Sequence, residues 1–151
     1  MDDLRDLYQE VILDHGKNPR NFRHPSDCNR MAECDNPLCG DRLTVYLRIG
    51  GNGRVEDVAF EGRGCAISMA SASMMTEIVQ GKTEQEARAL FDRFHDFVTG
   101  RDAIEAAYND DLEKLVVLSG VKQFPMRVKC ATLAWHTMTA AMDGDHVVTT
   151  E

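Results

Sequence analysis

The segment from residue 43 to residue 60 constrains the fold most, because it has the pattern of two strands joined by a tight turn. Apolar side chains occupy alternate positions, at Leu43, Val45, Leu47 and Ile49, as in a strand with one buried face. A glycine-rich turn follows at residues 50–53, and Val58 and Phe60 belong to the returning strand. We therefore expect an antiparallel hairpin here.

Helical patterns precede and follow this hairpin. The apolar spacing predicts an amphipathic helix from Asp2 to about His15, which Gly16 would end. Further helices are expected over residues 66–80, 83–100, 102–108 and 125–142, whereas residues 112–118 are apolar but of ambiguous type. Residues 17–40 hold three prolines and three cysteines without a periodic pattern, so we expect a long loop there, and a loose tail from Asp143.

Length and charge limit the classes of function. The chain has 151 residues, with 17 basic and 25 acidic side chains and a net charge of −8. It contains no apolar run near eighteen residues, which argues against a membrane span, and its acidity argues against nucleic-acid binding through general positive charge. We expect one domain over residues 1–151. The N-terminus lacks the basic and apolar regions of a secretory signal, so we expect a reducing cytoplasm.

The five cysteines are the residues with the most chemical potential. They stand at positions 28, 34, 39, 65 and 130 and form no CxxC pair. Cys39 lies between Pro37 and Gly40, two residues before Asp41, Cys65 directly precedes a predicted helix, and Cys130 lies in the first turns of the last helix. Three thiols and one carboxylate could therefore converge, each from a separate element. Buried packing, metal binding and nucleophilic chemistry all remain open roles for them.

Three thiolates and one carboxylate would suit two kinds of metal group. Zinc takes four such ligands in a tetrahedron, and iron–sulfur clusters also take mainly thiolates. The four ligands carry four negative charges, of which a dication offsets two, so a buried site needs cations nearby. Arg63, Arg127 and Lys129 flank the candidate ligands in the sequence.

Four segments carry a resemblance to a known family. They are Leu7–Tyr8 through Asp14–His15 with Asn18–Pro19–Arg20–Asn21–Phe22, Asn36–Pro37–Leu38–Cys39–Gly40–Asp41, Gly62–Arg63–Gly64–Cys65–Ala66–Ile67–Ser68 with Ala70–Ser71–Ala72–Ser73, and Phe124–Pro125–Met126–Arg127–Val128–Lys129–Cys130 through Trp135. Through these motifs nearly the whole chain resembles the U-type (IscU/NifU-like) iron–sulfur cluster assembly proteins. Lys129 stands where the scaffold branch has a histidine that can bind metal, and the long segment between Cys65 and Cys130 is also typical of the SufU branch, which the chain resembles more closely.

The resemblance implies both a fold and a function. The fold would be α+β, with a small antiparallel sheet of about three strands packed against helices and a metal site at one exposed end; the third strand would lie near residues 62–66 or within 22–35. Cys39, Asp41, Cys65 and Cys130 would bind zinc. The protein would be a zinc-dependent sulfurtransferase that accepts persulfide sulfur on Cys39 from a SufS-type cysteine desulfurase and passes it to a downstream cluster scaffold. The alternative is a scaffold that builds a [2Fe–2S] cluster on the same ligands.

The remaining candidate residues receive simpler interpretations. Cys28 and Cys34 have no counterpart in the motifs, so we interpret them as loop thiols. None of the five histidines shows paired ligand spacing, and none is assigned to metal. Small or apolar side chains on the predicted helices are expected to serve packing: Ser68, Met69, Ser71, Ser73, Met74, Met75 and Trp135.

Overall fold

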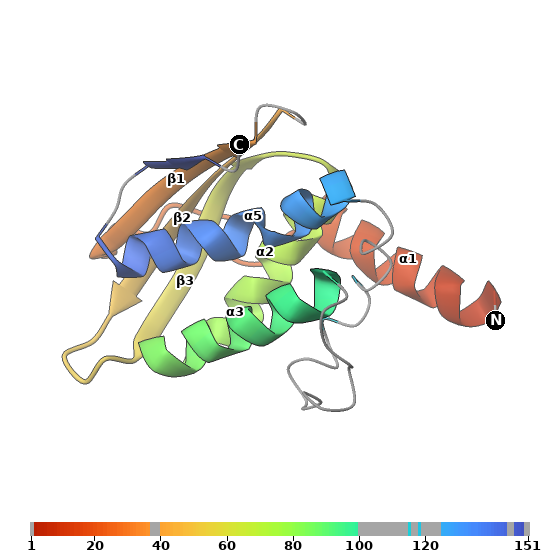
Figure 1. The fold of residues 1–151 in the computed structure, drawn as a ribbon. Coiled ribbons are helices and arrows are strands. Elements are labelled where there is room, and N and C mark those ends of the chain that lie inside the picture. The colour runs from red at the N-terminus through yellow and green to blue at the C-terminus, as the bar shows by residue number, and fades with distance from the viewer. Residues whose placement is uncertain are drawn as a thin grey trace.

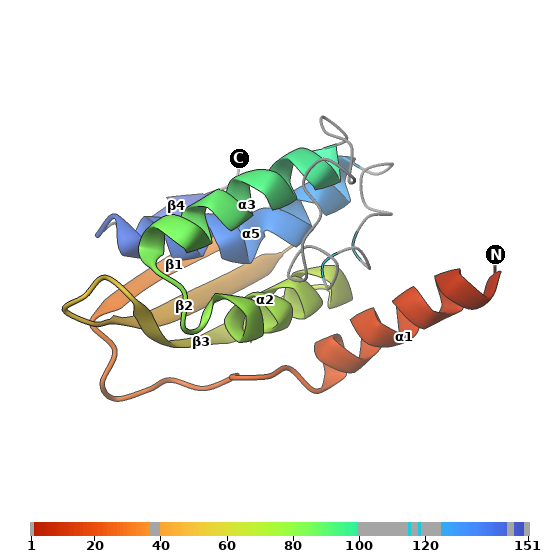
Figure 2. The ribbon, with the colours of Figure 1, turned by 90° about the horizontal axis from the view of Figure 1, so that it is seen from below.

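The computed structural model describes residues 2–36, 40–99, 115, 118, 125–144 and 147–149. Its elements in chain order are α1 (Asp2–Lys17), β1 (Arg30–Asn36), β2 (Asp41–Ile49), β3 (Val55–Arg63), α2 (Ala66–Val79), α3 (Glu84–Thr99), α5 (Pro125–Met142) and β4 (Val147–Thr149). Helix α5 packs on β1 and β2, and α2 packs on β3. Helix α3 lies against α5, while α1 lies along α2 and extends past it (Figures 1 and 2).

The sheet confirms the α+β fold and adds one strand to it. Its order is β3-β2-β1-β4, with antiparallel pairing between β1 and β2 and between β2 and β3. The predicted hairpin is β2–β3. Strand β1 is the third strand, and it lies in the expected range of residues 22–35 except for its last residue, Asn36. It also corrects the expectation of a long loop over residues 17–40, since its backbone pairs with β2. The expectation of a loose tail is wrong at β4, which pairs in parallel with Glu33–Asp35 of β1.

The predicted helices form close to their expected bounds. Helix α1 ends at Lys17, one residue beyond the expected stop. Before α3, the Thr83 hydroxyl accepts a hydrogen bond from the Glu86 amide at 3.1 Å, and the Glu86 carboxylate accepts one from the Thr83 amide at 2.9 Å. These two bonds form a capping box, which satisfies two free amides at the start of the helix. The expected helix at 102–108 and the apolar stretch at 112–118 lie outside the described residues, except for the buried Leu115 and Leu118.

The core lies between the sheet and the helices. The alternating apolar side chains of β2 all face it, and Trp135 of α5 is fully buried there. Phe91 and Phe94 of α3 pack on the Trp135 ring, with ring centroids 6.0 and 5.2 Å away. Met74 and Met75 are buried and Met69 packs against the core, as predicted. This packing gives the strands and helices a common rigid base.

Hydrogen bonds fix the end of α1 and the following segment to α2. The Ser73 hydroxyl lies 2.7 Å from His15 Nδ1 and accepts a bond from the Arg20 amide at 2.8 Å. The Asn21 side-chain amide donates to the Thr76 hydroxyl at 3.0 Å. Burial, with a smaller contribution from the charge of Arg20, lowers the pKa of His15. Ser73 thus has a specific hydrogen-bonding role beyond that of a small packing residue.

Among the described residues, no helix is both long and apolar enough to cross a membrane.

Candidate metal centre

Three of the four predicted ligands meet at one end of the sheet. Asp41 is the first residue of β2, Cys65 caps the N-terminus of α2, and Cys130 lies in the second turn of α5. Their donor atoms all lie within 4.8 Å of one another. Asp41 and Cys130 are buried, whereas Cys65 is partly exposed. The fourth predicted ligand, Cys39, lies outside the described residues.

The Asp41 carboxylate is held by two donors at the N-terminus of α2. Its Oδ1 accepts a hydrogen bond from the Cys65 amide at 2.9 Å, and its Oδ2 accepts one from the Ser68 hydroxyl at 2.6 Å. A helix N-terminus has free amides and the positive end of the helix dipole, both of which favour a carboxylate. Asp41 is therefore oriented without any metal.

The Cys65 thiol is set up to ionise. A hydrogen bond from the Cys130 thiol is the main cause that lowers its pKa, to about 5, and the Ser68 amide adds to this with a bond to Sγ at 3.5 Å. Burial and the Asp41 carboxylate act in the opposite direction. The thiolate is the form that binds metals, so Cys65 is in its ligand form at neutral pH.

The predicted cations differ in their placement. The Arg127 guanidinium lies 4.0 Å from Cys130 Sγ, one helical turn away on α5, as the sequence spacing predicts. Arg63 is exposed at the end of β3, directly opposite Arg42 of β2. Lys129 is partly buried on α5. Within the described part of the chain, neither Arg63 nor Lys129 forms an ion pair, so Arg127 is the cation that the structure places against a candidate ligand.

The donor set fits a thiolate-rich metal group. Zinc–sulfur bonds are about 2.3 Å long, so ligands of one zinc ion lie roughly 4 Å apart, close to the spacing of these donors. Two thiols and one carboxylate fill three positions of a tetrahedron and require one more ligand. The same thiols also suit an iron–sulfur cluster, so the donor set alone does not select the metal.

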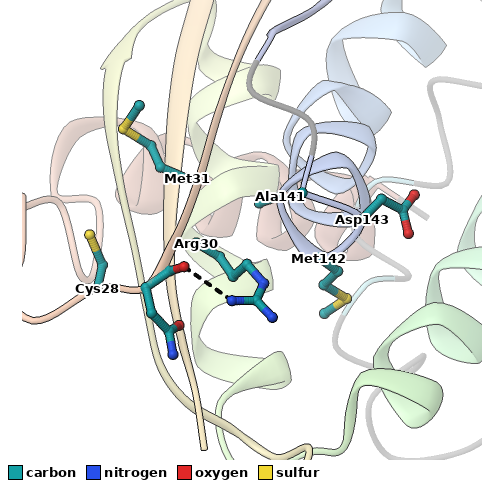
Figure 3. Close-up of a pocket in the computed structure, with 8 residues that line it drawn as sticks. Cys28, Arg30, Met31, Ala141, Met142 and Asp143 are labelled. Carbon is teal, nitrogen blue, oxygen red and sulfur yellow. Dashed lines mark hydrogen bonds between the residues drawn. The ribbon is translucent and has the colours of Figure 1, made fainter.

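Of the two unassigned thiols, Cys34 corrects the sequence interpretation. It is not a loop thiol but a residue of β1 whose side chain is 1% exposed, and burial raises its pKa. Cys28 precedes β1 and lines a cavity of about 460 Å³ between the start of β1 and the end of α5 (Figure 3). This cavity lies at the opposite ends of β1 and α5 from Asp41 and Cys130. Both thiols are free, and neither belongs to the group of candidate ligands formed by Asp41, Cys65 and Cys130.

The histidines in the described part of the chain lie outside the group formed by Asp41, Cys65 and Cys130. His24 stacks on Tyr46 with a centroid distance of 4.2 Å, and His95 and His136 pack around Phe91. Among the described residues, the only group of three or more His, Cys, Asp or Glu side chains suited to a metal is Asp41, Cys65 and Cys130.

Sequence reasoning missed the role of Ser68. We interpreted Ser68 and Ser71 as small residues that allow close packing. Both are fully buried, but the Ser68 hydroxyl donates a hydrogen bond to the carboxylate of the candidate ligand Asp41. The Ser71 hydroxyl instead donates to the Ala131 carbonyl and accepts a hydrogen bond from the Trp135 indole at 3.1 Å. The sequence did contain one signal. Ser68 stands three residues after Cys65, the N-cap of α2, and the side chain at that position of a helix lies close to the N-cap residue.

Comparison with known proteins extends these observations. Residues 7–131 match the model of the NifU-like N-terminal domain. The chain is 44% identical to the zinc-dependent sulfurtransferase SufU of Bacillus subtilis, over 89% of this chain and 88% of that protein, and 40% identical to the iron–sulfur cluster assembly scaffold protein IscU of Streptococcus pyogenes, over 92% and 84%.

Two solved structures have a similar fold. One is described as an iron–sulfur cluster assembly scaffold for the SUF system of Fervidobacterium islandicum, with a TM-score of 0.81 and 34% identity over 91% of this chain and 98% of that one. The other is the N-terminal part of a NifU-like protein of Brucella abortus, with a TM-score of 0.82 and 25% identity over 93% and 95%.

Proposed function

The chain belongs to the family of NifU-like N-terminal domains, which includes iron–sulfur cluster assembly proteins, and from this premise we propose that it is a zinc-dependent sulfurtransferase. In this role it accepts persulfide sulfur from a SufS-type cysteine desulfurase on Cys39 and passes that sulfur to a downstream cluster scaffold. Cys39, Asp41, Cys65 and Cys130 are the proposed zinc ligands. We place the reaction in the cytoplasm, where thiols stay reduced.

The observation that carries the proposal is the convergence of Asp41, Cys65 and Cys130. These residues bring two thiols and a fixed carboxylate from three elements to one point, and three is one ligand short of a zinc tetrahedron. Cys39 is two residues from Asp41, so the chain itself keeps it within about 8 Å of that residue, Cα to Cα. Lys129 precedes Cys130, and an ammonium group does not bind metal, so we do not count Lys129 among the proposed ligands.

The proposed chemistry is exchange between a thiolate and a persulfide. The Cys39 thiolate attacks the outer sulfur of the persulfide on the desulfurase; a new sulfur–sulfur bond forms, the old one breaks, and the desulfurase cysteine leaves as a thiolate. No net oxidation occurs, because the outer sulfur moves in the oxidation state in which it arrives. Zinc, when bound, would keep the ligand thiols deprotonated without redox chemistry of its own.

The other described residues prepare the site for this exchange. Cys65 and Cys130 remain as ligands, with the low pKa of Cys65 keeping it a thiolate. Asp41 is held by α2 and leaves no buried carboxylate oxygen without a donor. Arg127, beside Cys130, supplies positive charge against the excess negative charge of the ligands.

A desulfurase assay tests the proposal. Sulfide release from cysteine by the desulfurase is measured with and without the zinc-loaded protein. The wild type should stimulate sulfide release, and Cys39→Ala should abolish the stimulation. Cys28→Ser changes a thiol that is not a proposed zinc ligand, so this variant should retain the stimulation. Full stimulation by Cys39→Ala would reject Cys39 as the sulfur acceptor.

A second candidate function is assembly of a [2Fe–2S] cluster on the same ligands. The IscU scaffold of Streptococcus pyogenes, 40% identical, and the thiolate-rich donor set favour it. Anaerobic purification separates the two functions. Colourless protein with about one zinc per chain is expected for sulfur transfer, whereas brown, iron-rich protein would favour the scaffold.

A further inference from the structure

The Ser68 hydroxyl contacts every element of the candidate metal centre. Its Oγ lies 2.6 Å from Asp41 Oδ2, 3.3 Å from the Cys130 carbonyl oxygen and 3.7 Å from Cys65 Sγ. The side chain is fully buried, so no bulk water can replace these contacts. Ser68, a residue of α2, thus lies at the point where α2 meets β2 and α5.

A single proton limits what this hydroxyl can do. A serine hydroxyl donates one hydrogen bond, and two oxygen acceptors and the Cys65 sulfur surround it. The distance to Asp41 Oδ2 is within the short range of a hydroxyl bound to an ionised carboxylate, about 2.5–2.7 Å, while the other two contacts are long. The proton therefore goes to Asp41, and the bond is of the stronger, charge-assisted kind.

We propose that Ser68 is a positioning residue that holds the Asp41 carboxylate in place for the metal and thereby sets how tightly the site binds it. This inference rests on the proposed function, because it takes Asp41 as a metal ligand. With Ser68, each carboxylate oxygen has one donor from α2 and retains lone pairs for a metal. Without the hydroxyl, the buried Oδ2 loses that donor. Among the described residues, the Cys65 amide and a longer contact from the Cys65 thiol, at 4.0 Å, then remain at the carboxylate.

Ser71 supplies a matched control. It lies one turn further along α2, is equally buried, and also bonds across to α5 through the Ala131 carbonyl. Within the described residues, its other partner is the indole of Trp135, and the structure gives it no bond to the side chain of Asp41, Cys65 or Cys130. Ser68→Ala and Ser71→Ala therefore remove similar buried hydroxyls, but only the first removes a contact with Asp41.

Zinc titration against a chromophoric chelator measures the expected effect. Removal of a residue that orients a metal ligand typically weakens binding about 10- to 100-fold, and we expect this loss for Ser68→Ala. Ser71→Ala should bind zinc as tightly as the wild type. In the Co²⁺-loaded proteins, the visible absorption bands should shift for Ser68→Ala alone, because those bands report ligand geometry rather than stability.

A double mutant shows whether Ser68 acts through Asp41. In the Asp41→Ala background, Ser68→Ala should cause no further loss of zinc affinity. This pair also leaves no orphaned carboxylate, so it remains a valid measurement if Ser68→Ala alone folds poorly. An undiminished loss in the Asp41→Ala background, or wild-type affinity in Ser68→Ala, would overturn the inference.

These outcomes are separable from failure of the proposed function. Wild-type protein that binds zinc but does not stimulate the desulfurase would reject sulfur transfer and leave the Ser68 inference standing if the affinity pattern holds. Stimulation with unchanged zinc affinity in Ser68→Ala would reject the Ser68 inference alone. Wild-type protein that binds no zinc would reject both.

Discussion

Gly64, between β3 and α2, lets Asp41 and Ser68 approach the start of the helix. A Cβ atom at Gly64 would lie 2.8 Å from Asp41 Oδ1 and 3.1 Å from the Ser68 Cβ. Both contacts are shorter than side chains normally tolerate, and both neighbours are buried. The carboxylate would have to move, and the bond from the Cys65 amide to the same oxygen would lengthen with it.

We therefore expect Gly64→Ala to weaken zinc binding by roughly 10-fold or more, the effect typical of disturbing the surroundings of a metal ligand. Gly51→Ala is the matched control, because a Cβ at Gly51 meets open space. Zinc affinity by chelator competition checks both variants. Equal affinities would show that Asp41 has room to adjust without loss of ligation.

Gly62, two residues earlier, has a different structural role. Its φ is +135°, and a Cβ there would clash with the backbone carbonyl oxygen of Arg42. Backbone cannot move aside as a side chain can, so this glycine allows β3 to approach β2 directly beside the site. The two glycines thus have different roles. Gly62 permits the close pairing of β3 with β2, and Gly64 leaves room for the side chain of the candidate ligand Asp41.

At the level of elements, the contact between α1 and α2 depends on the charge state of His15. Burial and the nearby Arg20 lower the pKa of His15 below its ordinary value of 6.5, with Glu77 and Asp14 opposing the shift. The folded state therefore favours the neutral ring, which can share a hydrogen bond with Ser73. The resulting stabilisation is complete above about pH 6.5 and is lost as the pH falls through the lower pKa of the folded state.

Hydrogen exchange tests this dependence locally. After correction for intrinsic rates, amides at the end of α1 should exchange faster at pH 5.5 than at pH 7.5 in the wild type. His15→Asn, which keeps a hydrogen-bonding group near the position of Nδ1 but does not titrate there, should lack the difference. The measurement must be local because burial also lowers the pKa of His136. An equal pH response in both proteins would exclude His15 as its cause.

A helix or strand could be predicted when the residues of its own segment carry a recognisable pattern. The capping box before α3 and the apolar alternation of β2 are local patterns, and both were predicted correctly. The residue pattern predicted a loop where β1 forms, because the inward residues of this strand, Ala32, Cys34 and Asn36, are small or polar and show no hydrophobic alternation. A strand in this range was expected from the resemblance alone. Strand β4 has three residues and exists through its pairing with β1, which a sequence pattern does not reveal.

For the molecule as a whole, the site was predicted from motifs and its detail came from the fold. Asp41, Cys65 and Cys130 have no metal-binding spacing, and only their motif context indicated convergence. The hydroxyl of Ser68 was missed because its partners, Asp41 and Cys130, lie on other elements, and a serine in a helix gives no sign of which group it will meet. Residue type and motif thus predict candidate ligands, while packing determines which groups orient them.

The proposed metal binding would be coupled to folding across the molecule. The proposed ligands come from β2, α2 and α5, and in the unfolded chain nothing holds these segments together. A metal that binds only the folded state stabilises it by about 2.7 kcal/mol when its free concentration is 100 times the dissociation constant. For a chain of 151 residues this corresponds to an increase in Tm of roughly 5–10 °C.

We therefore expect Tm to rise with free zinc concentration and to fall when a chelator is added, as measured by differential scanning fluorimetry or circular dichroism. Cys130→Ala removes a buried ligand and should abolish the dependence, whereas Cys28→Ser, outside the cluster, should retain it. Both comparisons use the slope of Tm against zinc rather than Tm itself, because Cys130→Ala also changes core packing. A zinc site that loses one of its thiolate ligands binds zinc far more weakly. If Tm rose with zinc concentration as steeply in Cys130→Ala as in the wild type, the stabilising metal would therefore be bound at other residues.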